Sequence, residues 1–191
     1  MSGFDSLRGQ FLIAGQRLRD ENFYRTVVLM VEHSSEGAMG LVINRPSGIS
    51  VSSALSEHFQ LPETSDVVYV GGPVEPSALF ILHNTPSLDE TEAEIVPGLY
   101  VGSSARVFET VVRTSVEEED SELKFRIYSG CAGWSAGQLE QELANGDWLQ
   151  CPASCDIVLH EDPYHCWDAA LQQVRDRFTV LPRSPVNPEL N

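Results

Sequence analysis

The sequence is short of positive charge. Only 12 lysines and arginines stand against 28 aspartates and glutamates, which gives a formal net charge of −16 at pH 7. Such a chain repels the phosphate backbone of nucleic acids at long range. The nearest approach to a basic patch is Arg17, Arg19 and Arg25, or the pair Arg175 and Arg177, and both groups are sparse. We therefore expect no direct binding to nucleic acid.

The sequence also lacks long apolar runs and is poor in cysteine. No run approaches the roughly 18 residues of a membrane-spanning helix. Near the start, the apolar run from Phe11 to Gly15 is too short for the core of a secretory signal. We expect a cytoplasmic protein that does not interact with membranes. Its four cysteines are then reduced thiols rather than disulfides.

Familiar cofactor and metal motifs are missing. Neither the phosphate-binding pattern G-x-x-x-x-G-K-[ST] nor the dinucleotide pattern G-x-G-x-x-G occurs. The cysteines near the C-terminus lack the paired C-x-x-C spacing of structural zinc sites. We predict no cofactor and no metal. The sequence leaves open whether five potential ligands cluster in space: Cys151, Cys155, His160, His165 and Cys166.

The length of 191 residues suits one domain. We place that domain at residues 1–181. Residues 182–191 contain three prolines and little apolar content, so we predict a flexible tail there.

The apolar pattern predicts both strands and helices. Thr26 to Glu32 is a continuous apolar run, typical of a buried strand, and Ala38 to Asn44 is its hairpin partner. Further strands are expected at residues 67–70, 79–83, 99–101, 123–128 and 156–159, and helices at residues 51–59, 104–113, 136–144 and 163–178. Strand, helix and strand over residues 99–128 predict a parallel pair with a right-handed crossover. The turn at Gly130 would follow the carboxyl end of the second strand, where α/β sheets bind ligands.

The most unusual stretch runs from Gly130 to Glu140, with the sequence GCAGWSAGQLE. Gly130 and Gly133 indicate a turn with positive φ or a close approach of another group. Gly137, within the first helical turn, costs about 0.5–1 kcal/mol relative to alanine. Free amides at the start of the helix suit an anion.

Folding alone explains the other half of this stretch. Ser135 and Gln138 have the S-x-x-Q spacing of a capping box, in which each side chain bonds the backbone amide of the other residue. Trp134 and Leu139 have the spacing of a hydrophobic staple.

Cys131 is the candidate catalytic residue of the stretch. A thiol near a helix N-terminus can have a lowered pKa and react as the thiolate. Catalysis would also require a base, and the sequence does not indicate which histidine lies nearby. The competing interpretation is a small buried thiol that fills space.

Three blocks resemble the YqgE/AlgH family of bacterial proteins: residues 9–46, which include Glu32-His33 and Asn44-Arg45-Pro46; residues 70–74; and the Gly130 stretch through Trp148-Leu149. The resemblance implies an α+β fold in which a mixed sheet curls toward a partial barrel, with helices packed around it. It implies no activity, although members carry the label of transcriptional regulator. The family often has tyrosine at the position of Cys131, which argues against a shared nucleophile there.

Our leading prediction is a non-catalytic module that binds a small ligand or acts in regulation. The candidate binding residues are Gly130, Gly133, Trp134, Gly137 and Gln138, together with Asn44, Arg45, Gly71 and Gly72, whose turns would line the same pocket. Arg45 would supply charge for a small anionic ligand. A protein partner is the other option, and the oligomeric state is not readable. The alternative prediction is an enzyme, a hydrolase or thiol-dependent transferase, that uses the turn from Gly130 to Gly137.

Overall fold

The computed structural model describes residues 5–15, 18, 20–57, 59–61, 63–86, 88, 90, 92–118 and 122–179, apart from the side chains of residues 178 and 179. The predicted tail at residues 182–191 lies outside this range.

Strands dominate the described part of the chain. They are β1 (Gln10–Ala14), β2 (Val27–Ser34), β3 (Gly37–Val42), β4 (Pro46–Ser50), β5 (Val67–Val70), β6 (Val74–His83), β7 (Ala93–Val96), β8 (Leu99–Gly102), β9 (Phe125–Ser135) and β10 (Trp148–Pro152). The helices are α1 (Val51–Leu55), α2 (Ala105–Glu117), α3 (Gln138–Asn145), α4 (Cys155–Val158) and α5 (His165–Thr179).

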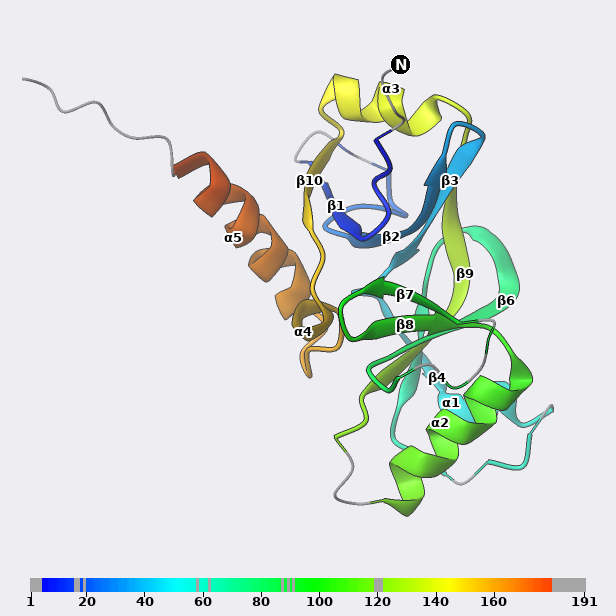
Figure 1. Cartoon of the computed structure of the whole chain (residues 1–191). Helices are drawn as coiled ribbons and strands as arrows, with labels where there is room; N and C mark the ends of the chain where they lie inside the picture. The colour runs from blue at the N-terminus through cyan, green and yellow to red at the C-terminus, as the bar shows by residue number, and fades with distance from the viewer. Residues whose placement is uncertain are drawn as a thin grey trace, which may run out of the picture.

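The strands form one curled, mixed sheet (Figure 1). Its order is β10-β1-β2-β3-β9-β6-β8-β7, with β5 paired to β9 and β4 paired to β5. The β5–β9 pair is parallel, and the other pairs are antiparallel. In Figure 1, α3 lies at one end of the sheet, α1 and α2 lie at the other, and α5 lies along one side. The predicted α+β fold with a curling mixed sheet is confirmed.

The long strand β9 joins the two halves of the sheet. Its first half, Phe125–Ser129, pairs with β5 and β6, and its second half pairs with β3. Gly130 sits between them with φ +72°. The predicted turn at Gly130 was therefore wrong, because partners on both sides carry the strand on to Ser135. Glycine lets the backbone bend there without ending the strand.

Three apolar clusters follow from this arrangement. A central cluster lies between the two halves of the sheet and α5, and it includes Leu29, Leu82 and Tyr128. A second contains Trp134, Leu139 and Trp148. A third joins α1 and α2 to the other half of the sheet.

The predicted parallel pair of residues 99–101 and 123–128 was wrong in its pairing. β8 and β9 run in the same direction, but β6 lies between them and pairs antiparallel with both. The parallel neighbour of β9 is β5 instead. Strand order depends on contacts between distant segments, which a strand-helix-strand pattern does not encode.

The C-terminal region contains a second correction. The predicted strand at residues 156–159 is the short helix α4, and the strand of this region is β10, which pairs with β1. A short apolar run does not distinguish a buried strand from a helical turn. The predicted stop of the preceding helix is confirmed, because α3 ends at Asn145 and Gly146 follows with φ +77°. The helix predicted at residues 51–59 is shorter and ends at Leu55.

Candidate functional site

The segments that contain the predicted glycines do meet, but their backbones pack directly against each other and leave no pocket between these glycines. We call the contact of Gly71 and Gly72 with Gly130 and Cys131 the glycine crossing. A Cβ atom on Gly71 would lie 2.2 Å from the Gly130 carbonyl oxygen, and one on Gly72 would lie 2.2 Å from the Cys131 carbonyl carbon. The Gly71 amide also donates to the Ser129 carbonyl at 2.9 Å. Backbone packing therefore accounts for these three glycines.

The other two glycines of the stretch have more space. Gly133 is exposed, and a Cβ there would make an ordinary contact with Val74 at 3.5 Å. Gly137 has φ +76° and is the N-cap of α3, with no side-chain cap bond. The Gln138 side chain accepts from the Ser135 amide at 3.1 Å, so half of the predicted capping box is confirmed. The other half was wrong, because the helix begins two residues later than predicted.

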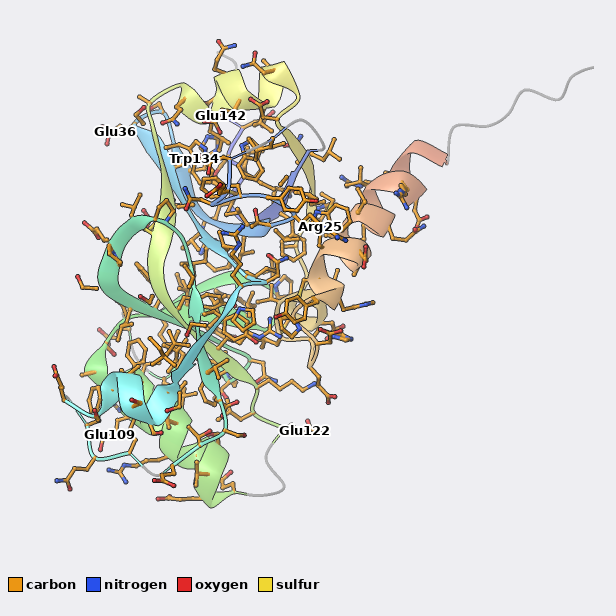
Figure 2. The ribbon with its side chains drawn as sticks, turned by 180° about the vertical axis from the view of Figure 1, so that it is seen from behind. Arg25, Glu36, Glu109, Glu122, Trp134 and Glu142 are labelled. Atoms are coloured by element: carbon orange, nitrogen blue, oxygen red, sulfur yellow. The ribbon has the colours of Figure 1, made fainter. Side chains whose placement is uncertain are left out.

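Trp134 and Trp148 attach the sheet to α3 through one side chain of the helix, Glu142. The indole N–H groups of Trp134 and Trp148 each donate to the same Glu142 carboxylate oxygen at 2.8 Å. Gln138 donates to the other oxygen of Glu142 at 3.0 Å. Figure 2 labels Glu142 at α3 and Trp134 close to it, on the side of the helix that faces the sheet. Both predicted residues are thus engaged in contacts within the fold.

Asn44 and Arg45 hold the loop before β2. The Asn44 side chain accepts from the Val27 amide at 3.0 Å and donates to the Arg25 carbonyl at 3.0 Å. Arg45 donates to the carbonyl oxygens of Glu21 and Tyr24 at 2.8 and 3.3 Å. Burial lowers the pKa of Arg45, and the charge of Asp20 opposes this shift. Arg45, which the sequence predicted to bind an anionic ligand, therefore donates to backbone carbonyls instead.

Cys131 is buried in β9, opposite Val74 of β6. Burial raises the pKa of its thiol, and the charge of Glu75 adds to the shift. The nearest following helix, α3, begins only at Gln138. These features are the opposite of those that activate a thiolate. The structure thus gives no physical support to the enzyme alternative through Cys131.

The three cysteines of the C-terminal region bond to separate carbonyls. Cys151 donates to Ala170 at 3.7 Å, Cys155 to Gly98 at 3.4 Å and Cys166 to Ile157 at 3.0 Å. The rings of His160 and His165 lie against each other, tilted by 31°, with centroids 4.4 Å apart. Within the described residues, no three histidine, cysteine, aspartate or glutamate side chains are placed to hold a metal ion.

A groove that the sequence did not predict lies at the beginning of β9. Two hollows of about 420 and 550 Å³ share Lys124, Leu159, His160 and Glu161. The first is also lined by Ser65, Asp66, Val67, Tyr69, Ser115, Leu123, Phe125 and Arg126, and the second by Asn84, Glu122, Cys155 and Asp156. We call the pair of hollows the Lys124 groove. None of the predicted ligand-binding residues lines it.

One signal in the sequence could have indicated this groove. Lys124 is the only lysine of the chain, and it stands two residues before Arg126, an arginine within a predicted apolar strand. Figure 2 labels Glu122, which borders the second hollow, at the opposite end of the molecule from Trp134. The groove and the Trp134 region are therefore separate sites.

Arg126 forms part of the first hollow and is only 7% exposed. Its Nη1 atom donates to the carbonyl oxygens of Ile43 and Val158 at 3.3 and 2.6 Å, and its Nη2 atom donates to that of His160. The guanidinium carbon lies 4.7 Å from the centre of the Tyr69 ring. No carboxylate in the described part of the chain forms an ion pair with it.

The Tyr128 hydroxyl is next to this guanidinium and is fully buried. It makes no hydrogen bond of ordinary geometry within the described residues, and its polar neighbour is the Arg126 guanidinium. Burial raises the pKa of Tyr128 well above its ordinary value, and the Arg126 charge opposes the shift. The hydroxyl is therefore neutral at physiological pH and lies beside a buried cation.

Comparison with known proteins places the chain in a family. The sequence model described as AlgH-like matches residues 11–179. The chain belongs to the AlgH-like family. The YqgE/AlgH resemblance of the three sequence blocks is thereby confirmed.

Similar sequences cover nearly the whole chain. A UPF0301 protein of Marinomonas sp. is 38% identical over 162 residues, which are 82% of this chain and 83% of that protein. A UPF0301 protein of Chlorobaculum tepidum is 33% identical over 183 residues, 96% of this chain and 95% of that one.

Two solved structures share the fold. The solution structure of the AlgH protein of Pseudomonas aeruginosa has a TM-score of 0.69 and 34% identity, and it covers 96% of this chain and 98% of its own. A crystal structure of a Corynebacterium diphtheriae protein has a TM-score of 0.62 at 23% identity, with 86% of both chains covered. The family is one whose function is uncharacterised. No helix among the described residues is long and apolar enough to cross a membrane.

Proposed function

We propose that this chain is a non-catalytic module that binds a small polar ligand in the Lys124 groove. The observation that carries the proposal is the position of Lys124, the only lysine of the chain, where two hollows meet. The hollows measure about 420 and 550 Å³. Small-molecule sites occupy about 300–1,000 Å³.

The lining of the groove supports a ligand with directed polar contacts. Most of it comes from three separate segments of the chain, residues 65–69, 122–126 and 155–161, and Asn84 and Ser115 complete it. It combines carboxylates, a lysine, an arginine and an imidazole with apolar side chains such as Leu159. A few convergent polar groups on an apolar wall fix the orientation of a ligand.

A regulatory role is supported by Arg126, which lines the groove and also holds a neighbouring connection in place. Arg126 ties the connection between α4 and α5 to the end of β3 through the carbonyls of His160, Val158 and Ile43. A ligand that contacts this connection would change how firmly it is held. We place this role in the cytoplasm, where cell fractionation tests it.

The single lysine gives a direct experiment. An amine-reactive reagent modifies Lys124 and the α-amino group of the chain, and mass spectrometry measures the two rates separately. A metabolite library is screened for compounds that slow the labelling of Lys124, and a binding ligand is expected to slow it at least tenfold at saturation. The α-amino group is the internal reference.

A matched variant provides the spatial control. Arg106→Lys introduces a second amine on the exposed face of α2, at the other end of the helix from Ser115. Its labelling rate is expected to stay constant when the ligand is added. If ligands that stabilise the protein leave Lys124 fully reactive, or bind Lys124→Gln with unchanged affinity, the groove is not their site.

A further inference from the structure

We propose that His33 is a proton-controlled latch for residues 6–9, which we call the strap. The neutral imidazole holds the start of the strap on the molecule, and protonation of the ring releases it while α3 stays attached. The latch goes beyond the proposed function, because none of its residues lines the Lys124 groove. Figure 2 labels Glu36, which borders a hollow next to His33, at the Trp134 end of the molecule and away from Glu122.

The His33 imidazole joins the strap to α3. The Leu7 amide donates to its Nδ1 atom at 2.9 Å, and its Nε2 atom lies 2.9 Å from an oxygen of the Glu140 carboxylate. A backbone amide can only donate, so Nδ1 is unprotonated and the ring proton is on Nε2, which donates it to Glu140. The His33 side chain is only 3% exposed. The neutral ring therefore serves the strap as an acceptor and the helix as a donor.

Protonation changes these two contacts in opposite directions. The added proton goes to Nδ1, where its N–H would face the N–H of Leu7, so this hydrogen bond is lost. The contact with Glu140 becomes an ion pair and is strengthened. A backbone hydrogen bond and the bond from His33 lower the pKa of Glu140, although burial opposes the shift, so this carboxylate stays charged between pH 5 and 8. Acidification therefore breaks the strap side of the latch and keeps the helix side.

The other side-chain contacts of the strap are more exposed. The bond from Leu7 to His33 is part-buried. The Ser6 hydroxyl donates to the His33 carbonyl at 3.0 Å, and Arg8 donates to the Glu94 carbonyl at 2.8 Å, both in exposed positions. Water competes for exposed hydrogen bonds, so each contributes little net stability. The contact with the imidazole is therefore the one whose loss frees the start of the strap.

Gly9 fixes the other end of the strap. Its amide donates to the Met30 carbonyl at 2.9 Å, and its carbonyl accepts from the Ala153 amide at 3.0 Å. These backbone bonds do not involve His33. Release would therefore turn the strap about Gly9 and withdraw the Leu7 side chain, which packs against the second apolar cluster. The apolar surface that Leu7 covers would then become accessible.

Several charged groups face the imidazole, from every element around it. Glu140 faces it from α3. The hollow of about 480 Å³ beside the ring is bordered by Arg8 of the strap, Glu32 of β2 and Glu36 of the turn before β3. β3 lines this hollow with uncharged residues. Among these groups only His33 is of a side-chain type that ordinarily changes its charge between pH 5 and 8.

NMR on the whole chain between pH 5 and 8 tests the latch. The nitrogen shifts of the imidazole report the protonation of His33. Exchange of the Leu7 amide with solvent, divided by the intrinsic rate at each pH, reports the strap. We expect the protection of Leu7 to fall at least tenfold as His33 gains its proton, about the factor of one hydrogen bond. The amides of Gly9 and of Gln141 in α3 should keep their protection.

Two variants control the comparison. His33→Gln retains one acceptor and one donor but does not titrate, so the protection of Leu7 should no longer depend on pH. His165→Gln removes an exposed imidazole at the start of α5 and should respond to pH as the wild type does. The measurement on the wild type stands by itself, so the test does not depend on the folding of either variant.

Three outcomes would overturn the latch. The first is unchanged protection of Leu7 while His33 is protonated, and the second is a ring that stays neutral down to pH 5. The third is a His33→Gln variant that still loses the protection of Leu7 on acidification. Loss of protection in α3 together with the strap would also refute it, because the acid response would then be a general loosening of this end of the molecule.

Discussion

Strand β9 contains two regions of opposite character, the glycine crossing and the wall of the Lys124 groove. At the crossing, Gly130 and Cys131 press against Gly71 and Gly72, and backbone atoms occupy the space that side chains would take. A few residues earlier, Lys124 and Arg126 border hollows of several hundred cubic ångströms. Glycines allow two segments of the backbone to touch, whereas the groove is open and is bordered by long charged side chains. A glycine-rich stretch therefore marks close backbone packing here, and the charged residues mark the candidate site.

The largest expected effect comes from Gly72→Ala at the crossing. The added Cβ would lie 2.2 Å from the Cys131 carbonyl carbon, at a residue with φ +153°. We expect a loss of about 3 kcal/mol or more in the free energy of unfolding. Urea denaturation measures it.

Gly137→Ala is the matched control for that change. Gly137 has a positive φ but nothing within 4 Å of an added Cβ. The expected loss is about 1–2 kcal/mol, the cost of the left-handed conformation alone. Equal losses in the two variants would show that close packing is not what distinguishes the crossing.

The next effect comes from Arg126→Gln in the groove. The change leaves the carbonyls of Ile43, Val158 and His160 without their donor. We expect a loss of about 2–3 kcal/mol in a chemical denaturation experiment. Arg113→Gln removes an exposed ion pair with Glu109 at 3.1 Å and should cost about 0.3–0.5 kcal/mol. If both changes cost the same, Arg126 does not anchor the groove to the core.

Part of the alkaline pH dependence of stability is expected to come from the groups around Arg126. Burial raises the pKa of Tyr69, Tyr128 and Cys166, so the folded state holds these protons more tightly than the unfolded state does. The stabilisation is complete below the unfolded pKa values, about 8.5 for cysteine and 10 for tyrosine, and is lost as the pH rises past them. Urea midpoints between pH 7 and 10.5, with reductant present, should fall on the alkaline side. Tyr128→Phe should flatten this fall, and an unchanged slope would contradict the assignment.

The smallest effect on stability is expected for Lys124→Gln. The side chain is exposed and makes no ion pair with any described residue. Its loss should change the free energy of unfolding by less than about 0.5 kcal/mol. Ligand binding in the groove should nevertheless weaken, which calorimetry on the same variant checks. A large loss of stability would mean that Lys124 supports the fold rather than the ligand.

Local patterns in the sequence predicted much of the secondary structure. The apolar run after Thr26, the hairpin partner from Ala38 and the stop at Gly146 are all present in the structure. The capping-box spacing found one true contact, from the Gln138 side chain to the Ser135 amide. These features depend on residues a few positions apart, so a single sequence encodes them.

The candidate site could not be predicted in the same way. The sequence suggested that Gly71, Gly72 and Gly130 share a turn region, but not that their backbones would touch. It also placed Arg45 as the free cation, whereas the fold turns that side chain onto carbonyls of the loop before β2. The sequence shows the isolated Lys124 and the Arg126 within an apolar strand, but their role depends on the distant residues that surround them in the fold.

The sequence by itself determined the family, the α+β character and the acidic charge balance, because these follow from local motifs and composition. The tertiary structure alone decided that β9 continues through Gly130, since the partners on its two sides are β3 and β6, about 90 and 50 residues away along the chain. The tertiary structure also decided that Arg126 is the buried cation near the groove. Residues 65–69, 122–126 and 155–161 meet only when the sheet curls and the α4–α5 connection closes over it. Burial and hydrogen bonding depend on such distant contacts, and they separate the glycine crossing from the groove.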